Sequence, residues 1–196
     1  MQRRSLLKGS GAILGGAVAS LAAPAKLRAA SQTTLRFIPQ IDLVYLDPVY
    51  TTPYVSRNHG YLVFDTLYGQ DSAFRARPQM VAGHEVSPDG LAWRLTLRDG
   101  MRFHDGEPVL ARDCVASIRR WGARDGFGQT LMAATEELAA EGDRVIRFRL
   151  KRPFPLLPDA LGKAGSAICA IMPERLARTD PFTQVTEMVG SGPFRF

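Results

Sequence analysis

The chain has 196 residues, 45% of them hydrophobic, which suits a globular protein of one or two compact units. A formal charge of +6 would favour nucleic acid or an anionic membrane as a partner. Five of the 25 basic residues lie in residues 1–30, where there is no acid, so the remaining 20 face 19 acidic residues. The body of the chain is nearly neutral, and we expect no nucleic-acid partner.

Residues 1–30 have the pattern of an export signal. Arg3 and Arg4 precede a pair of leucines, and a weakly apolar run rich in Gly and Ala follows over 9–23. This resembles a twin-arginine (Tat) signal peptide. The alternative, a transmembrane anchor, is disfavoured because the run is too short and glycine-rich for a hydrocarbon core of about 30 Å. Small residues at 23–25 and 29–30 predict a mature chain that begins between Lys26 and Ser31, soluble in the periplasm.

The chain has only two cysteines, which limits both disulfides and metal sites. Cys114 falls on the apolar stripe of a predicted helix and Cys169 inside an apolar run, so we expect buried free thiols, although a disulfide remains open. With two cysteines and three histidines, no ligand spacing for a structural metal site is present. We expect no metal and no cofactor.

The first elements of the predicted mature chain are short and interrupted by prolines. Alternating Leu35 and Phe37 predict a strand over 33–39. Pro48 and Pro53 punctuate an irregular stretch, since the residue before a proline is pushed away from helical geometry. Apolar spacing over 58–67 then predicts a helix with one aromatic face.

Residues 87–121 carry the clearest local signals. Residues 87–90 (SPDG) predict a turn, residues 91–98 alternate as a half-buried strand, and Asp99-Gly100 predicts a hairpin turn into a returning strand at Met101 and Phe103. After Pro108, apolar residues recur at helical spacing over 111–121. We expect a small antiparallel meander followed by an amphipathic helix.

The second half of the chain alternates between regular patterns and prolines. The run over 130–142 predicts a helix that ends at Gly142, and residues 144–150 predict a strand. Residues 167–172 predict a strand that leads into Pro173 at the start of a helix. Phe194 and Phe196 resemble the opening of another strand, which suggests that the sequence is cut at this point.

Several of these motifs occur together in one known family. The run from Trp93 to Ser117 (WRLTLRDGMRFHDGEPVLARDCVAS), with Arg77-Pro78 and the turn over 87–90, resembles the signature of the peptide/nickel-binding solute-binding proteins, family 5, which serve ABC importers. Further landmarks follow in the same order at 46–48, 171–173 and 190–194. The sequence departs from the family pattern at His84, Leu110 and Cys114.

The resemblance implies a mixed α/β protein with the two-lobed, class II periplasmic-binding-protein-like fold. It places the first strand and loop of lobe I at 31–45, an inserted subdomain at 46–185 and a return strand at 186–196, with lobe II missing. It also implies a monomer that binds a peptide or similar small solute between its lobes and delivers it to ABC permease subunits in the inner membrane.

The candidate ligand contacts lie in the loop that follows the first predicted strand. By the resemblance this loop lines the cleft, and irregular loops at strand ends often carry ligand contacts. An ordinary surface loop is the alternative. The residues that we expect to contact ligand have hydroxyl, aromatic or amide side chains: Gln40, Tyr45, Tyr50, Thr51 and Thr52.

Other polar residues are better explained as structural. His104-Asp105 could act as a base or a metal ligand, but adjacent strand residues point apart and no nucleophile is placed beside them. Arginines at 144, 147, 149 and 152 could bind an acidic solute, although alternation favours a solvated strand face. Trp93 and Trp121 fall on predicted apolar faces and are expected in the core.

The principal alternative function is a Tat-exported periplasmic enzyme or redox protein. The sequence lacks a dinucleotide fingerprint, a haem attachment pair and an iron–sulfur cysteine cluster. A structural or adhesive protein would require repeats, and none is seen. We therefore expect a binding protein with no catalytic residues.

Overall fold

The computed structural model describes residues 36–165 and 167–196 of the chain. Residues 39–196 form one compact unit, and residues 36–38 fall in a separate one. The predicted signal peptide lies outside the described residues, as do residues 33–35 of the first predicted strand. The rest of that prediction is wrong, because residues 36–39 are irregular and no described strand pairs with them.

The larger sheet of the unit is four-stranded and antiparallel, in the order β3-β4-β6-β5. Its strands are β3 (Val81–Val86), β4 (Ala92–Leu97), β5 (Thr135–Glu141) and β6 (Val145–Leu150). A separate antiparallel pair consists of β1 (Tyr68–Gln70) and β2 (Ala76–Pro78). The strands predicted over 91–98 and 144–150 are confirmed as β4 and β6.

The two faces of the sheet differ because its strands alternate. Trp93 and Leu95 of β4 and Phe148 of β6 are buried on one face. On the other face, Arg147 pairs with Glu137 of β5 at 2.9 Å, and both side chains remain partly exposed. The arginines of β6 therefore form the solvated strand face that the alternation predicts.

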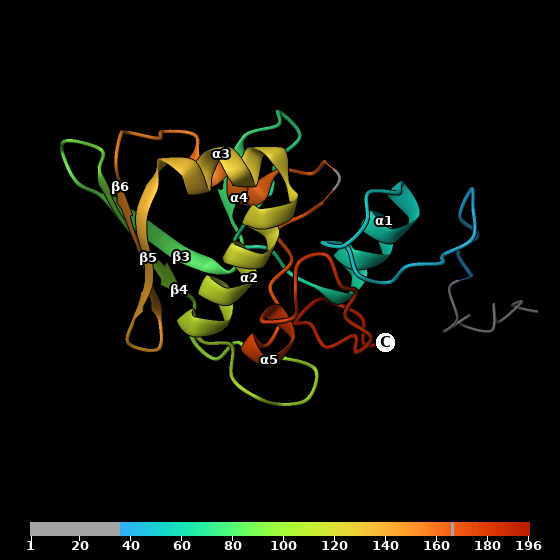
Figure 1. Ribbon diagram of the computed structural model, residues 1–196. Helices are drawn as coiled ribbons and strands as arrows, with labels where there is room; N and C mark the ends of the chain where they lie inside the picture. The colour runs from blue at the N-terminus through green and yellow to red at the C-terminus, as the bar shows by residue number, and fades with distance from the viewer. Residues whose placement is uncertain (1–35, 166) are drawn as a thin grey trace, which may run out of the picture. The chain divides into compact units, whose positions relative to one another are not determined.

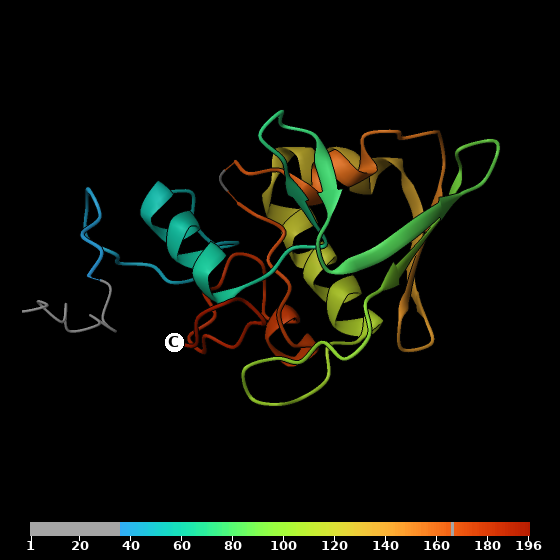
Figure 2. The same ribbon diagram turned by 180° about the vertical axis from the view of Figure 1, so that it is seen from behind.

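The described residues also form five helices. They are α1 (Tyr54–Val63), α2 (Ala111–Arg124), α3 (Gly126–Ala134), α4 (Leu157–Gly162) and α5 (Glu174–Ala177). Helix α2 lies across the sheet in both views (Figures 1 and 2). It is the amphipathic helix predicted after Pro108, whereas α1 begins and ends about four residues earlier than the sequence predicted.

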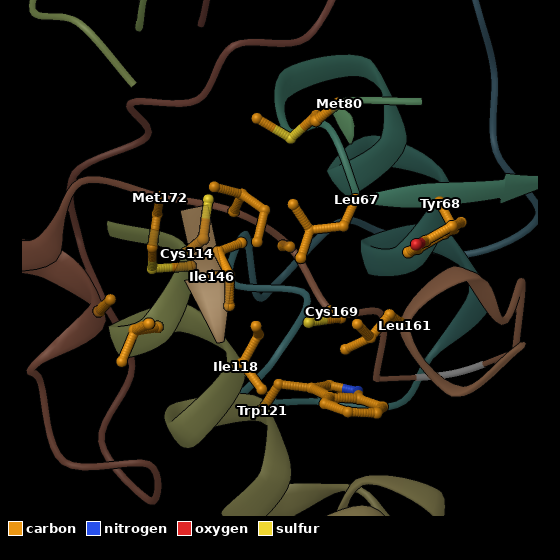
Figure 3. Close-up of a cluster of buried hydrophobic side chains, with 14 of the residues drawn as sticks. Leu67, Tyr68, Met80, Cys114, Ile118, Trp121, Ile146, Leu161, Cys169 and Met172 are labelled. Carbon is orange, nitrogen blue, oxygen red and sulfur yellow. The ribbon is translucent and has the colours of Figure 1, made fainter. Parts of the chain in front are cut away.

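The core lies between α2, the sheet and the segment that follows α4 (Figure 3). Trp121 is fully buried and its indole Nε1 donates a hydrogen bond to the Ala167 carbonyl at 2.6 Å. Cys114 and Cys169 are both buried and unpaired, which confirms the prediction of free thiols, and burial raises the pKa of each. The prediction that Trp93 and Trp121 belong to the core is also confirmed.

The helix predicted over 130–142 is wrong in its second half. Helix α3 ends at Ala134, and residues 135–141 form β5 alongside β6. In this register Leu138 lies opposite Phe148 and is buried, while Glu137 lies opposite Arg149. Packing against β6 thus overrides the helical preference of an Ala- and Glu-rich run.

Three other predicted strands are absent from the described chain. Asp99-Gly100 forms the expected turn, with Gly100 at φ +71°, but both edges of β4 are already occupied by β3 and β6. The chain therefore enters a loop closed by a single bridge between Arg102 and Pro108. Residues 167–172 are buried but irregular, with Ile171 N–H bonded to the Asp65 carbonyl at 3.0 Å, and residues 194–196 are irregular too.

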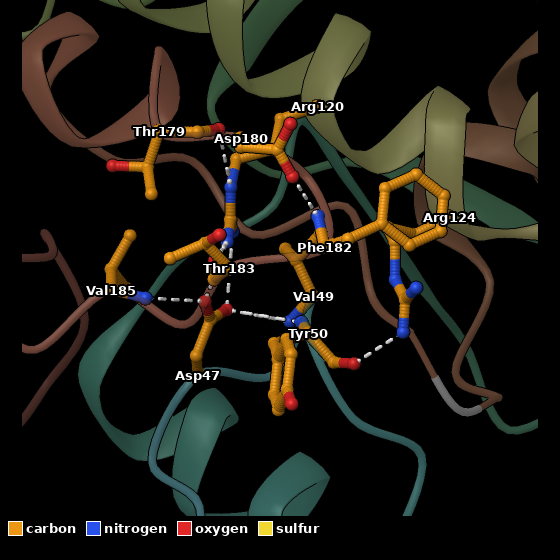
Figure 4. A network of polar contacts seen from close by, with 10 residues as sticks. All are labelled: Asp47, Val49, Tyr50, Arg120, Arg124, Thr179, Asp180, Phe182, Thr183 and Val185. Atoms are coloured by element: carbon orange, nitrogen blue, oxygen red, sulfur yellow. Dashed lines mark hydrogen bonds and ion pairs between the residues drawn. The ribbon is translucent and has the colours of Figure 1, made fainter.

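A buried ion pair fixes the irregular stretch near residue 47 to the unit (Figure 4). The Asp47 and Arg120 side chains are 0% and 1% exposed, and Nη2 of Arg120 lies 2.7 Å from Oδ2 of Asp47. Asp47 also accepts hydrogen bonds from the backbone N–H groups of Val49, Tyr50 and Val185. Arg120 in turn donates to the carbonyls of Thr179 and Thr183.

This network joins three separate parts of the chain. Every charged group in it has partners on at least two segments, which is the condition under which a buried ion pair is tolerated. The network thereby fixes three segments relative to one another: residues 47–50, the middle of α2 and residues 179–185.

A close backbone contact holds the last described residues against α1. The N–H of Gly192 donates to the Val63 carbonyl at 2.9 Å, and the Ser191 hydroxyl donates to Asp65 at 3.0 Å. A Cβ atom added to Gly190 would lie 2.0 Å from the Val63 carbonyl oxygen. Only glycine allows this approach.

Replacing Arg120 by methionine leaves the Asp47 carboxylate buried without its cationic partner. We expect the free energy of unfolding to fall by about 3–5 kcal/mol, measured by urea denaturation. Arg94→Met, which removes an exposed pair with Glu141, is the control and should cost at most about 1 kcal/mol. Equal losses in both variants would contradict the role of the buried pair.

Replacing Gly190 by alanine forces the last segment away from α1. We expect a loss of about 2 kcal/mol or more in thermal or urea unfolding, because backbone and not a flexible side chain occupies the space. Gly83→Ala is the control, since no atom lies within 4 Å of its added Cβ. A Gly190→Ala variant as stable as Gly83→Ala would show that the contact is not formed.

Candidate functional site

The predicted ligand loop presents two neighbouring aromatic rings. The Tyr45 ring is 41% exposed, and its centroid lies 5.6 Å from that of the half-buried Tyr50 ring. The Ser56 hydroxyl of α1 donates to the Tyr45 carbonyl at 2.5 Å, which fixes the backbone at this point. The fold therefore brings together two of the five predicted contact residues.

The other three predicted residues are at least partly accessible. Gln40 and Thr52 are exposed and Thr51 is half-buried. Within the described residues, the side-chain hydroxyl groups of Tyr45, Tyr50, Thr51 and Thr52 have no hydrogen-bond partner. These groups are available to bond a solute.

A small cavity lies beside this loop. Its volume is about 110 Å³, and most of its wall is apolar. Of the predicted residues only Tyr45 lines it; the full lining is Ile41, Asp42, Val44, Tyr45, Pro53, Val55 and Ser56. A cavity of this size accepts one small apolar side chain and not a whole peptide.

Arg124 is a residue of this region that the sequence did not reveal (Figure 4). Its guanidinium carbon lies 4.6 Å from the centroid of the Phe182 ring and 5.7 Å from that of Tyr50, within cation–π range. Its Nη2 donates to the Tyr50 carbonyl at 2.6 Å. A basic residue in the last turn of a helix is ordinarily explained by its favourable interaction with the helix dipole. The sequence therefore gives no sign that Arg124 contacts the loop.

The His104-Asp105 pair faces structural partners. The backbone N–H of His104 donates to the Gly190 carbonyl at 2.8 Å, and Nε2 donates to the Gly192 carbonyl at 2.9 Å. Asp105 pairs with Arg175 at 3.1 Å. Burial pushes the pKa of Asp105 upward, but bonds from the Glu107 N–H and from Arg175 outweigh it and lower that pKa. The imidazole and the carboxylate share no hydrogen bond, which a catalytic pair of this kind would need.

Among residues 36–165 and 167–196, no three His, Cys, Asp or Glu side chains are grouped as metal ligands. None of the helices in this part of the chain has the length and apolar character to span a bilayer.

Relatives with curated sequences are much longer than this chain. The probable peptide ABC transporter periplasmic-binding protein y4tO of Sinorhizobium fredii is 40% identical over 200 residues, which covers 100% of this chain and 36% of the relative. The glutathione-binding protein GsiB of Salmonella typhi is 25% identical over 152 residues, covering 76% of this chain and 29% of its own. The chain thus spans about a third of the length of these relatives.

Solved structures share the fold at low identity. NikZ of Campylobacter jejuni, in complex with Ni(L-His), has a TM-score of 0.63 at 21% identity and covers 80% of this chain and 31% of its own. AppA of Bacillus subtilis, in complex with a nonapeptide, has a TM-score of 0.62 at 21% identity. The match covers 76% of this chain and 31% of the AppA chain. These similarities confirm the expected mixed α/β fold.

The family model agrees with the motifs from which the resemblance was inferred. The model described as "Bacterial extracellular solute-binding proteins, family 5 Middle" matches residues 75–196, which include the whole run from Trp93 to Ser117. The chain belongs to the family 5 bacterial extracellular solute-binding proteins.

Proposed function

We propose that this chain provides one wall of the ligand site in the substrate-binding component of an ABC importer. The observation that carries the proposal is the loop over 40–54, in which the exposed Tyr45 lies beside the half-buried Tyr50 and the backbone is fixed by the Asp47–Arg120 pair. A binding surface needs accessible groups on a rigid support, and this loop combines both.

The ligand class that fits this loop best is a peptide or a similar small solute. Aromatic rings and hydroxyl groups can stack on a peptide and bond its backbone without selecting one side chain. The 40% identical relative is named as a peptide transporter component, which supports the same class. Permease subunits of the inner membrane are the partners that such a protein would serve, as a monomer.

We propose that this chain corresponds to part of lobe I in the longer relatives. Residues 31–45 and 186–196 would belong to lobe I, and residues 46–185 would form a subdomain inserted in it. Large apolar side chains remain exposed near this junction, among them Tyr54, Leu62, Phe194 and Phe196. Residues beyond this chain would cover part of that surface and complete the pocket.

Export to the periplasm through the Tat route belongs to the same proposal. Its support is the position of Arg3 and Arg4 ahead of a weakly apolar run, together with the periplasmic location in the name of the 40% identical relative.

Alanine at both Tyr50 and Thr51 should weaken ligand binding by about 1–3 kcal/mol through the loss of buried hydrogen bonds. The measurement is calorimetric titration of the intact protein with the peptide that it binds. His104→Ala is the matched control, and it should lower thermal stability while leaving affinity unchanged. Loss of affinity in the His104 variant alone would place the site on the other side of this unit.

Changing Arg3 and Arg4 to lysine should leave precursor in the cytoplasm, because the Tat pathway recognises the arginine pair. Immunoblots of cytoplasmic and periplasmic fractions measure the effect. The control changes Lys26 and Arg28 to glutamine, which leaves the pair intact. Undiminished periplasmic protein in the lysine variant would exclude the Tat route.

A further inference from the structure

A second cavity lies on the side of α2 that faces α5. Its volume is about 340 Å³, and it shares no lining residue with the cavity beside Tyr45. Most of its lining is apolar and includes the buried Val115 and Ala177. Four arginines line it: Arg112, Arg119, Arg120 and Arg178.

The positive charge of this cavity exceeds the negative charge around it. Glu174 is the single carboxylate among the lining residues, and it pairs with both Arg112, at 3.7 Å, and Arg178, at 2.7 Å. Within the described part of the chain, Arg119 has no carboxylate partner; its Nη2 donates to the Leu138 carbonyl at 2.7 Å. Since Asp47 already neutralises Arg120, two guanidinium charges remain without a carboxylate of their own.

The arginines of the cavity are held by the fold to different degrees. Arg120 is fixed at the base by Asp47, Thr179 and Thr183. Arg119 is tethered to β5 through Leu138, while Arg112 and Arg178 converge on Glu174 from α2 and from the residue after α5. Convergence of positive charge on a concave, partly apolar surface concentrates its potential toward the opening.

We propose that this cavity binds a small organic anion that carries two or more carboxylate groups. Guanidinium groups bind carboxylates through paired, charge-assisted hydrogen bonds, and two uncompensated arginine charges match two carboxylates. The apolar part of the lining accommodates the carbon chain between them. The cavity shares no lining residue with the one beside Tyr45, although Arg120 at its base pairs with Asp47 of the loop over 40–54. A solute and this anion could therefore occupy the protein together.

Calorimetric titration of the intact protein with citrate at low ionic strength tests the proposal, with acetate as the single-carboxylate comparison. We expect citrate to bind with a dissociation constant below about 1 mM, and acetate at least about tenfold more weakly. Added sodium chloride should weaken citrate binding, since the charges at the rim are partly exposed.

The variant Arg119→Gln/Arg178→Gln should lower citrate affinity by about tenfold or more. Its matched control is Arg94→Gln/Arg149→Gln, which removes the same charge from the solvated face of the sheet, where each arginine already pairs with glutamate. Melting temperatures of both variants verify folding. Three results would overturn the proposal: no citrate binding at about 10 mM, unchanged affinity in the Arg119/Arg178 variant, or an equal loss in the control.

Discussion

The carboxylate of Asp47 is removed from water, and the arrangement of the loop around it follows from that constraint. A buried carboxylate must be compensated by charge and hydrogen bonds, and here Arg120 and three backbone N–H groups provide both. Because two of those N–H groups belong to Val49 and Tyr50, the same bonds set the direction in which the loop leaves the core. The position of the Tyr50 ring, and through it that of Arg124, therefore depends on a pair of charges that no solvent reaches.

The charged face of the four-stranded sheet stays in water, in contrast to the buried Asp47–Arg120 pair. Arginines of β4 and β6 pair with glutamates of β5 while remaining partly exposed, so they add solubility and register more than stability. One unit thus uses arginine in two ways. Arg120 organises the interior, while Arg94, Arg147 and Arg149 keep one surface of an antiparallel sheet solvated.

Sequence patterns predicted the elements whose signals are local. Strands β4 and β6 and helix α2 each carry a complete apolar periodicity, so they could be located without their partners. Strand β5 could not, because its Ala and Glu residues favour a helix and only pairing with β6 makes it extended. For the candidate site, composition alone was enough to select the loop. It could not predict the Tyr45–Tyr50 contact, the role of Arg124 or the Asp47–Arg120 pair. The members of that pair stand 73 positions apart, and nothing near either residue indicates the other.

The span of the Asp47 contacts has a consequence for the order in which the protein acquires its shape. Asp47 bonds to Arg120 and to Val185, the latter 138 positions away, so the loop cannot take its final form on the ribosome until the chain past residue 185 has emerged. Closing such long separations carries an entropic cost that the rest of the unit must first offset. The surface that presents Tyr45 and Tyr50 therefore forms only after residue 185 has emerged, and a chain that ends before that residue presents no competent version of it.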